Sequence, residues 1–125
     1  MSGYSVNIEK ATLDNKNFRK VLFTGPKSQL VVMALKPGED IGKEKHPNTD
    51  QFVRVEAGKA KAEIGGKEYR LKEGSAVVIP AGAVHNIINT SKEETLKLYT
   101  IYTPPEHPDG TIHKTKAAAE KAEKH

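Results

Sequence analysis

The stretch GSAVVIPAGAVHNIIN, residues 74–89, decides how this chain folds. It contains a short apolar run at residues 76–79, a Pro-Ala-Gly corner and a second short run that carries His85. Apolar runs of this length, rich in β-branched residues, are typical of buried strands rather than helices. Pro80 and Gly82 interrupt them, because proline donates no ladder hydrogen bond and glycine permits unusual dihedral angles. The stretch therefore predicts two buried strands joined by a tight corner that aims His85 into a concave interior.

Length and composition predict one domain built from β-strands. A chain of 125 residues has the size of a single domain with one substantial core. Its ten glycines and seven prolines indicate many turns, as in an all-β architecture. It has no cysteine, which excludes disulfides and thiolate metal ligands.

Charge and hydropathy narrow the expected partners and compartment. The net charge is +4, but the lysines are scattered and interleaved with glutamates, so we expect a solvated mixed surface and no nucleic-acid partner. No run approaches the ~18 apolar residues that span a bilayer, so no membrane partner is expected. Residues 1–10 lack the apolar region of a secretory signal, which favours a cytoplasmic protein.

Alternation of apolar residues predicts strands along most of the chain. A Gly65-Gly66 turn predicts a hairpin over residues 59–72, and Ala, Lys and Glu predict a short C-terminal helix over 115–124. Thr115 is the candidate helix cap, and Glu120 stands four residues before Lys124. The other predicted strands cover residues 4–10, 18–24, 30–35 and 96–102.

The segment over residues 39–58 places polar side chains toward the interior. Glu44 and His46 alternate with two lysines, and because lysines seek solvent the pair should point inward. Gln51 alternates in phase with two valines and should therefore face inward as well. Recognition of a phosphate group would require an inward lysine or arginine. The alternation identifies none, which argues against a substrate that carries a phosphate, such as a sugar phosphate.

Two spaced patterns resemble the sequence motifs of the cupin superfamily. The second motif is matched at every fixed position, by Gly74, Pro80, Gly82, His85 and Asn89. The first keeps its spacing but has Glu44 in place of a histidine and Gln51 in place of a glutamate, at the positions Gly38, Glu44, His46, Gln51 and Gly58.

The resemblance covers roughly residues 30–103 and implies the cupin double-stranded β-helix. This is an all-β fold, a β-sandwich barrel of two antiparallel sheets, to which the sequence adds the short C-terminal helix. Residues 1–125 are expected to form a single cupin domain, with the barrel core at about 18–103 and a C-terminal segment at 104–125.

The resemblance also implies a metal site at Glu44, His46, Gln51 and His85. Family members hold one divalent first-row transition metal at these positions: iron, manganese, nickel, copper or zinc. One carboxylate and two imidazoles suit such an ion and compose the 2-His-1-carboxylate set of open non-heme iron sites. The usual set of three histidines and one glutamate carries the same formal charge of one negative. With Glu44 in place of a histidine and Gln51 in place of a glutamate, the single carboxylate changes position but is not lost. The amide of Gln51 is a weaker donor that water can replace.

Three functions stay open. An enzyme would use an open metal position on a small polar substrate, in isomerase- or epimerase-like or oxygenase-like chemistry, with Glu44 as a general base where it is not a ligand. A non-catalytic module would bind either a metal ion or, in a metal-free pocket, a small ligand. A structural barrel would have no site.

The resemblance further implies a homodimer, because small cupins commonly pair sheet to sheet. The strand expected at residues 4–10 is a candidate for exchange between protomers. His107 and His113 are expected on the surface of the C-terminal segment, with contact to a barrel mouth as the alternative, and His125 is assigned no role.

Overall fold

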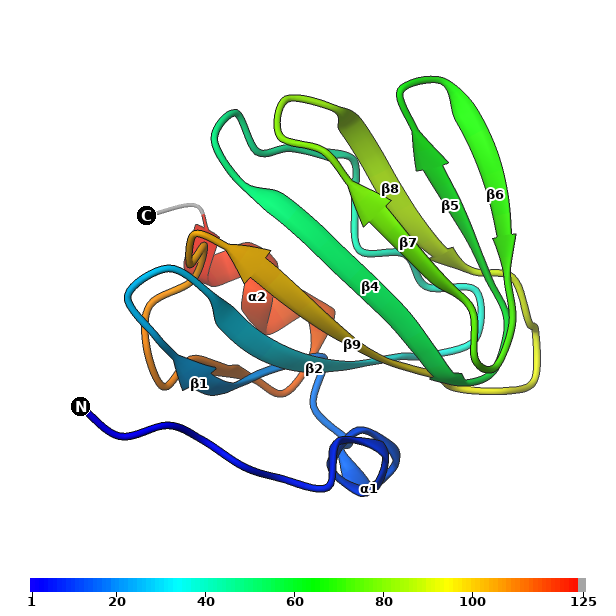
Figure 1. Cartoon of the computed structure of the whole chain (residues 1–125). Coiled ribbons are helices and arrows are strands. Elements are labelled where there is room, and N and C mark those ends of the chain that lie inside the picture. Colours follow the sequence, from blue (N-terminus) through cyan, green and yellow to red (C-terminus); the bar gives the residue numbers. More distant parts are fainter. Residues whose placement is uncertain (124–125) are drawn as a thin grey trace.

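Two antiparallel β-sheets face each other and enclose one hydrophobic core (Figure 1). The structure is a computed structural model and describes residues 1–123. The six-stranded sheet has the order β10-β1-β2-β9-β4-β7, and the four-stranded sheet has the order β3-β8-β5-β6. These strands are β1 (Arg19–Thr24), β2 (Gln29–Leu35), β3 (Glu44–Lys45), β4 (Asp50–Ala57), β5 (Ala60–Ile64), β6 (Lys67–Leu71), β7 (Ala76–Ile79), β8 (Val84–Asn89), β9 (Leu96–Thr103) and β10 (Ile112–His113). This β-sandwich confirms the fold class predicted above.

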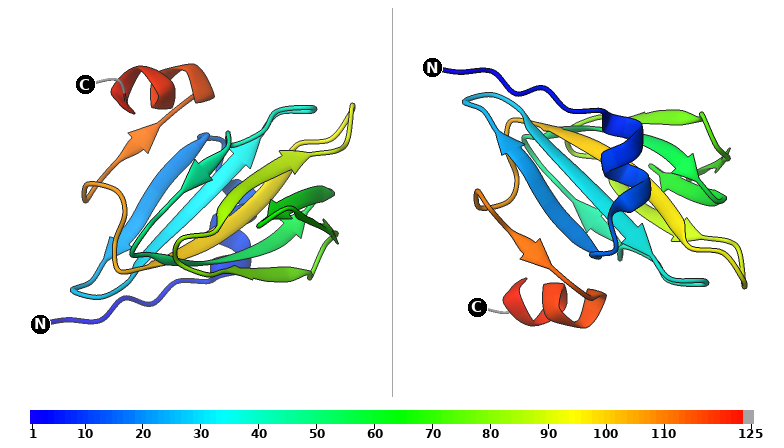
Figure 2. Two further views of the ribbon diagram at one scale, coloured as in Figure 1. Left: turned by 90° about the horizontal axis from the view of Figure 1, so that it is seen from above. Right: turned by 90° about the horizontal axis from the view of Figure 1, so that it is seen from below.

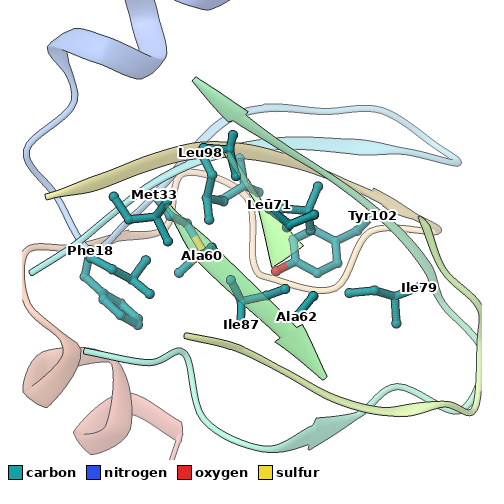
Figure 3. Packing of buried hydrophobic residues seen from close by; sticks show 14 of the residues in the cluster. Phe18, Met33, Ala60, Ala62, Leu71, Ile79, Ile87, Leu98 and Tyr102 are labelled. Carbon is teal, nitrogen blue, oxygen red and sulfur yellow. The ribbon is translucent and has the colours of Figure 1, made fainter. Parts of the chain in front are cut away.

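The core lies between the sheets because inward residues alternate along each strand. In Figure 3 the core side chains of the two sheets point toward one another, with Met33 and Leu98 on one side and Ala62 and Ile87 on the other. Tyr102 of β9 joins them and is only 3% exposed. The apolar run in β2 is buried on both faces, as its sequence predicts.

The outer face of β2 is buried by a helix, which forms where a strand was predicted over residues 4–10. Residues 4–10 do not form a strand: residues 1–7 have no regular structure and α1 spans Ile8–Asp14. Asn7 caps α1 by accepting a hydrogen bond from the Lys10 amide, and this cap outweighs the short period-two pattern. α1 packs against β2, β4 and β9 (Figure 2), so the strand suggested for exchange is absent from the protomer.

β7 also differs from its prediction. Only Ile79 of this strand is buried, while Val78 is 64% exposed. β7 is the edge strand of the six-stranded sheet, and nothing in the described chain covers its outer face. Apolar composition alone therefore overstated its burial.

The C-terminal segment returns to the barrel and extends the larger sheet. β10 pairs with β1, and α2 (Lys116–Glu123) follows. Thr115 caps α2 as predicted, since its hydroxyl accepts a hydrogen bond from the Ala118 amide. The predicted pair of Glu120 with Lys124, like His125, involves positions outside the described residues. Neither α1 nor α2 is long and apolar enough to cross a membrane.

Candidate functional site

Glu44 and His85 face each other across two neighbouring strands. β3 pairs with β8 in a register that sets these two residues opposite one another, so their side chains share one face. His85 is 5% exposed, and its Nδ1 lies 3.0 Å from the carbonyl oxygen of Ala83. Because that carbonyl only accepts, Nδ1 donates to it, and in the neutral ring this leaves the lone pair on Nε2. This tautomer is the one that metal-binding histidines commonly adopt.

His46 follows β3 directly and lies between two carboxylates. Its Nε2 is 3.1 Å from Oε2 of Glu44, and its Nδ1 is 3.0 Å from Oε1 of Glu106. Its ring centroid is 5.2 Å from that of His85. The structure thus brings Glu44 and His46, predicted to face inward by alternation, together with His85 of the 74–89 stretch, whereas Glu106 was not anticipated.

The two carboxylates control the protonation of His46. Its hydrogen bond with Glu44 raises the pKa of His46, burial opposes this, and the charge of Glu106 raises it further. Burial by itself would raise the pKa of Glu44, but the hydrogen bond and charge of His46 lower it overall. Since both ring nitrogens face acceptors, His46 donates from both as an imidazolium, and a metal ion at Nε2 would displace a proton.

Gln51 is 3% exposed on β4, which confirms its predicted inward direction. Its Nε2 donates to the hydroxyl of Thr100 at 3.1 Å. Its Oε1 is buried and has no partner among the described residues. A buried acceptor without a donor calls for a water or a cation, so the amide oxygen is chemically suited to a metal position.

Gln29 holds the C-terminal segment across the barrel mouth. Gln29 is 1% exposed on β2; its Oε1 accepts hydrogen bonds from the amides of Glu106 and His107, and its Nε2 donates to the His107 carbonyl. The prediction of His107 at the surface is therefore wrong: its Nε2 is buried and its ring lies 5.1 Å from that of Tyr102. No pattern in the proline-rich segment around residue 106 could have indicated this contact.

Arg19 is a second residue that sequence reasoning missed. It opens β1, is 2% exposed, and its charge helps to lower the pKa of Glu44. Its position in phase with the buried Val21 was the available signal. His113, half-buried on β10, contacts Arg19 rather than the Glu44 cluster.

A cleft of about 630 Å³ is lined by Glu44, His46, Glu106 and His107 and opens to solvent. The loop and strand over residues 41–46 form one wall. Residues 106–108 and α2 side chains, including Glu123, form the other. The site thus has room for a small molecule and is open at the surface.

The donors fit a metal ion in part. Glu44 Oε2 and His46 Nε2 are separated by 3.1 Å. Two ligand atoms on one ion, each bound at ~2.1 Å, are separated by roughly 3 Å. Within residues 1–123, however, no three His, Asp or Glu side chains form a set ready to hold a metal. The chain therefore offers suitable donor types, of which one pair already has the spacing of metal ligands.

Comparison with known proteins agrees with this architecture. The chain is 48% identical over 126 residues to the uncharacterized protein YrkC of Bacillus subtilis, covering 96% of this chain and 67% of that protein. It superposes on the crystal structure of BH2720 from Bacillus halodurans with a TM-score of 0.93 and 44% identity, covering 96% and 95% of the two chains. A predicted oxalate decarboxylase from Thermotoga maritima shares the fold, with a TM-score of 0.59 and 22% identity over 64% of this chain and 69% of that chain.

A family model for the cupin domain matches residues 31–102, nearly the range over which the two motifs were found. The matched range includes all four residues for which a metal role was predicted. By this match, by its relatives and by its two-sheet barrel, the chain belongs to the cupin family.

Proposed function

We propose that this cupin binds one first-row divalent metal ion and acts on a small polar metabolite. The proposed ligands are Glu44, His46 and His85, with the Oε1 of Gln51 or a water as the fourth. The observation that carries the proposal is the meeting of the first three on one inner face, with the Nε2 of His85 left free by its hydrogen bond to Ala83.

The remaining residues of the site would orient these groups and the substrate. A bound ion of this kind supplies Lewis acidity for isomerase- or epimerase-like chemistry, or redox chemistry for an oxygenase-like reaction. Glu106 accepts from Nδ1 of His46 and so orients its ring, which makes it a positioning residue. The cleft admits a small molecule beside these groups.

The second candidate is a metal-free pocket for a small ligand, in which Glu44 serves as a general base. It is favoured by the pairing of both His46 nitrogens with carboxylates, an arrangement that is satisfied without an ion. Glu44, whose carboxylate accepts a hydrogen bond from His46, would then take a proton from the ligand.

Elemental analysis of untagged protein, purified without chelator, separates the two candidates. We expect near-stoichiometric metal in the wild type and its loss in Glu44→Ala and His85→Ala. Glu93→Ala, which removes an exposed carboxylate in the turn before β9, is the matched control and should retain the metal. If reconstitution with iron, manganese, nickel, copper or zinc leaves the wild type empty, the metal proposal is wrong and the metal-free pocket stands.

We also propose a homodimer formed through the outer face of the six-stranded sheet, beside the part that α1 covers. Strand register aligns Phe23, Leu30, Ile101, Phe52 and Val78 in one row across β1, β2, β9, β4 and β7. We call this row the apolar stripe; its side chains are half-buried or exposed. A second copy is the proposed occupant because the stripe runs across five strands and can pair with itself about a two-fold axis.

A further inference from the structure

Arg19 is a buried cation whose hydrogen-bonding capacity is largely unused. Its guanidinium carries five N–H donors. Within the described residues, Nη1 lies 3.3 Å from Nδ1 of His113 and 3.4 Å from Oε1 of Glu123, and both contacts are long. The Nε atom is buried and has no partner in the described chain.

The two neighbours of Nη1 compensate the charge of Arg19 poorly. The side chain of Glu123 is 58% exposed, so water screens its carboxylate. His113 is neutral here, because a ring nitrogen that accepts from a guanidinium has no proton and because burial and the charge of Arg19 lower its pKa. A buried charge without a close buried partner is costly, and such a cost is commonly recovered by binding an anion.

His107 supplies a second unused group in the same interior. Its Nε2 is buried without a partner among residues 1–123, and Gln29 fixes its backbone. Burial, followed by the charge of Arg19, lowers the pKa of His107 to about 4, so the ring is neutral near pH 7. A neutral imidazole can donate from Nε2 to an anion without adding charge.

We infer that the ligand of this cupin carries a carboxylate, which the Nε edge of Arg19 and the Nε2 of His107 bind behind the cleft that His107 and the Arg19 partner Glu123 line. The contacts of Arg19 with His113 and Glu123 use Nη1, and they leave the edge formed by Nε and Nη2 for a bidentate carboxylate. The inference deepens the proposed function by naming the substrate class.

The surrounding charges favour a carboxylate over a phosphate. One guanidinium and one neutral imidazole balance a single negative charge. The cleft lining combines four carboxylates with three lysines, so it adds no net positive charge that would hold a phosphate dianion. These residues are Glu44, Glu106, Glu120, Glu123, Lys43, Lys45 and Lys116. The site is therefore suited to a monoanionic group on a small metabolite.

Nitrogen-15 NMR of the arginine side chains tests this contact directly. The chain has three arginines, so three Nε–H signals are expected. Arg54 Nε already bonds to Glu56 at 2.6 Å and the Arg70 side chain is 73% exposed, which makes both internal controls. The probes are lactate, its neutral isostere lactamide, and inorganic phosphate, at constant ionic strength.

We expect lactate to shift the Arg19 signal saturably, while lactamide has no effect and phosphate binds more weakly. In His107→Leu the lactate affinity should fall about tenfold, the effect of one lost hydrogen bond to a charged group, and His107→Gln should restore most of it. Lys20→Gln, on the outward side of the same strand, should bind as the wild type. Equal shifts of all three arginine signals, or no response of Arg19, would overturn the inference.

The same titration separates this inference from the metal proposal. It is run on zinc-loaded and on chelator-treated protein. A response of Arg19 to lactate in protein that takes up no metal supports the carboxylate site and contradicts the metal site. Metal uptake without any response of Arg19 in the zinc-loaded form supports the metal site and contradicts the carboxylate site.

Discussion

At the scale of single residues, the site depends on side chains whose polar atoms are buried and incompletely paired. Arg19 Nε, Gln51 Oε1 and His107 Nε2 are each buried without a partner in the described residues. Such groups reduce the stability of the folded chain. Of the three residues, His107 lines the cleft beside Glu44 and His46. His107 allows this cost to be measured, because its protonation links folding to pH.

The first prediction concerns the pH dependence of stability. In the folded protein the pKa of His107 is about 4. In the unfolded chain the group titrates near ~6.5, so the unfolded state binds more protons between these values. The free energy of unfolding should therefore fall as pH drops from ~6.5 toward 4, with at most ~3 kcal/mol due to His107.

Urea unfolding of the wild type and His107→Gln between pH 7.5 and pH 4.5 measures this contribution. The variant should lose much less stability over the range, since its side chain does not titrate. His113→Gln, which removes a half-buried histidine on β10, should change the slope only slightly. Parallel curves for the wild type and His107→Gln would show that His107 is not buried as a neutral ring.

At the scale of elements, β2 connects the barrel to the segment that completes the site. Gln29 begins β2 and makes three hydrogen bonds to the backbone of residues 106 and 107. These bonds set Glu106 beside His46 and His107 beside Tyr102. The side chain of the buried Gln29 thus satisfies backbone hydrogen-bonding groups of this irregular segment, as a neighbouring strand satisfies those of a regular strand.

The second prediction is that Gln29→Leu releases this segment while the barrel stays folded. Four lost hydrogen bonds, three of them to this segment, and two orphaned amides should cost about 2–4 kcal/mol. Hydrogen exchange by NMR is the measurement: the amides of residues 106 and 107 should exchange much faster, while amides in β9 remain protected. Thr24→Val removes only the contact of Gln29 Nε2 with the Thr24 hydroxyl and should leave both amides slow. Unchanged protection in Gln29→Leu would mean that other contacts hold the segment.

At the scale of the whole molecule, the barrel has two faces with different roles. The inner face of the six-stranded sheet carries Gln51 and Tyr102, and the outer face carries the apolar stripe. The functional groups come from both ends of the chain, because β1 and β10 pair at one edge of the same sheet. Assembly through the stripe would leave the cleft accessible, since the cleft is lined by β3, its preceding loop and the C-terminal segment.

The third prediction tests the proposed homodimer. Light scattering with size-exclusion chromatography should give twice the 13.7 kDa of one chain. Val78→Glu introduces a charge into the stripe and should produce a folded monomer. Tyr69→Glu changes an exposed aromatic residue on β6, outside the stripe, and should leave the dimer intact. A monomeric wild type, or a dimer unaffected by Val78→Glu, would contradict an interface on this face.

Local sequence determined most of the barrel. Alternation and turn residues predicted the strands from β1 to β9, including the hairpin of β5 and β6. Successive residues of a strand face the core and the solvent in turn, so the sequence itself carries an alternating apolar and polar pattern. Alternation also predicted that Glu44, His46 and Gln51 face the interior, since neighbouring residues of a strand point to opposite faces. The Pro-Ala-Gly corner predicted the same for His85. α1 was not predicted because the strand pattern and the helix pattern of this segment are both weak, and the Asn7 cap favours the helix.

Only the tertiary structure decided which distant groups complete the site. Gln29 holds Glu106 and His107 at the site, although these residues lie 77 and 78 positions further along the chain. Arg19 contacts Glu123, which lies 104 positions further along. Exposure of Val78 likewise follows from its strand's place at the sheet edge. Periodicity describes which face a residue occupies, but the partner across that face depends on how the sheets are ordered and closed, which no local pattern encodes.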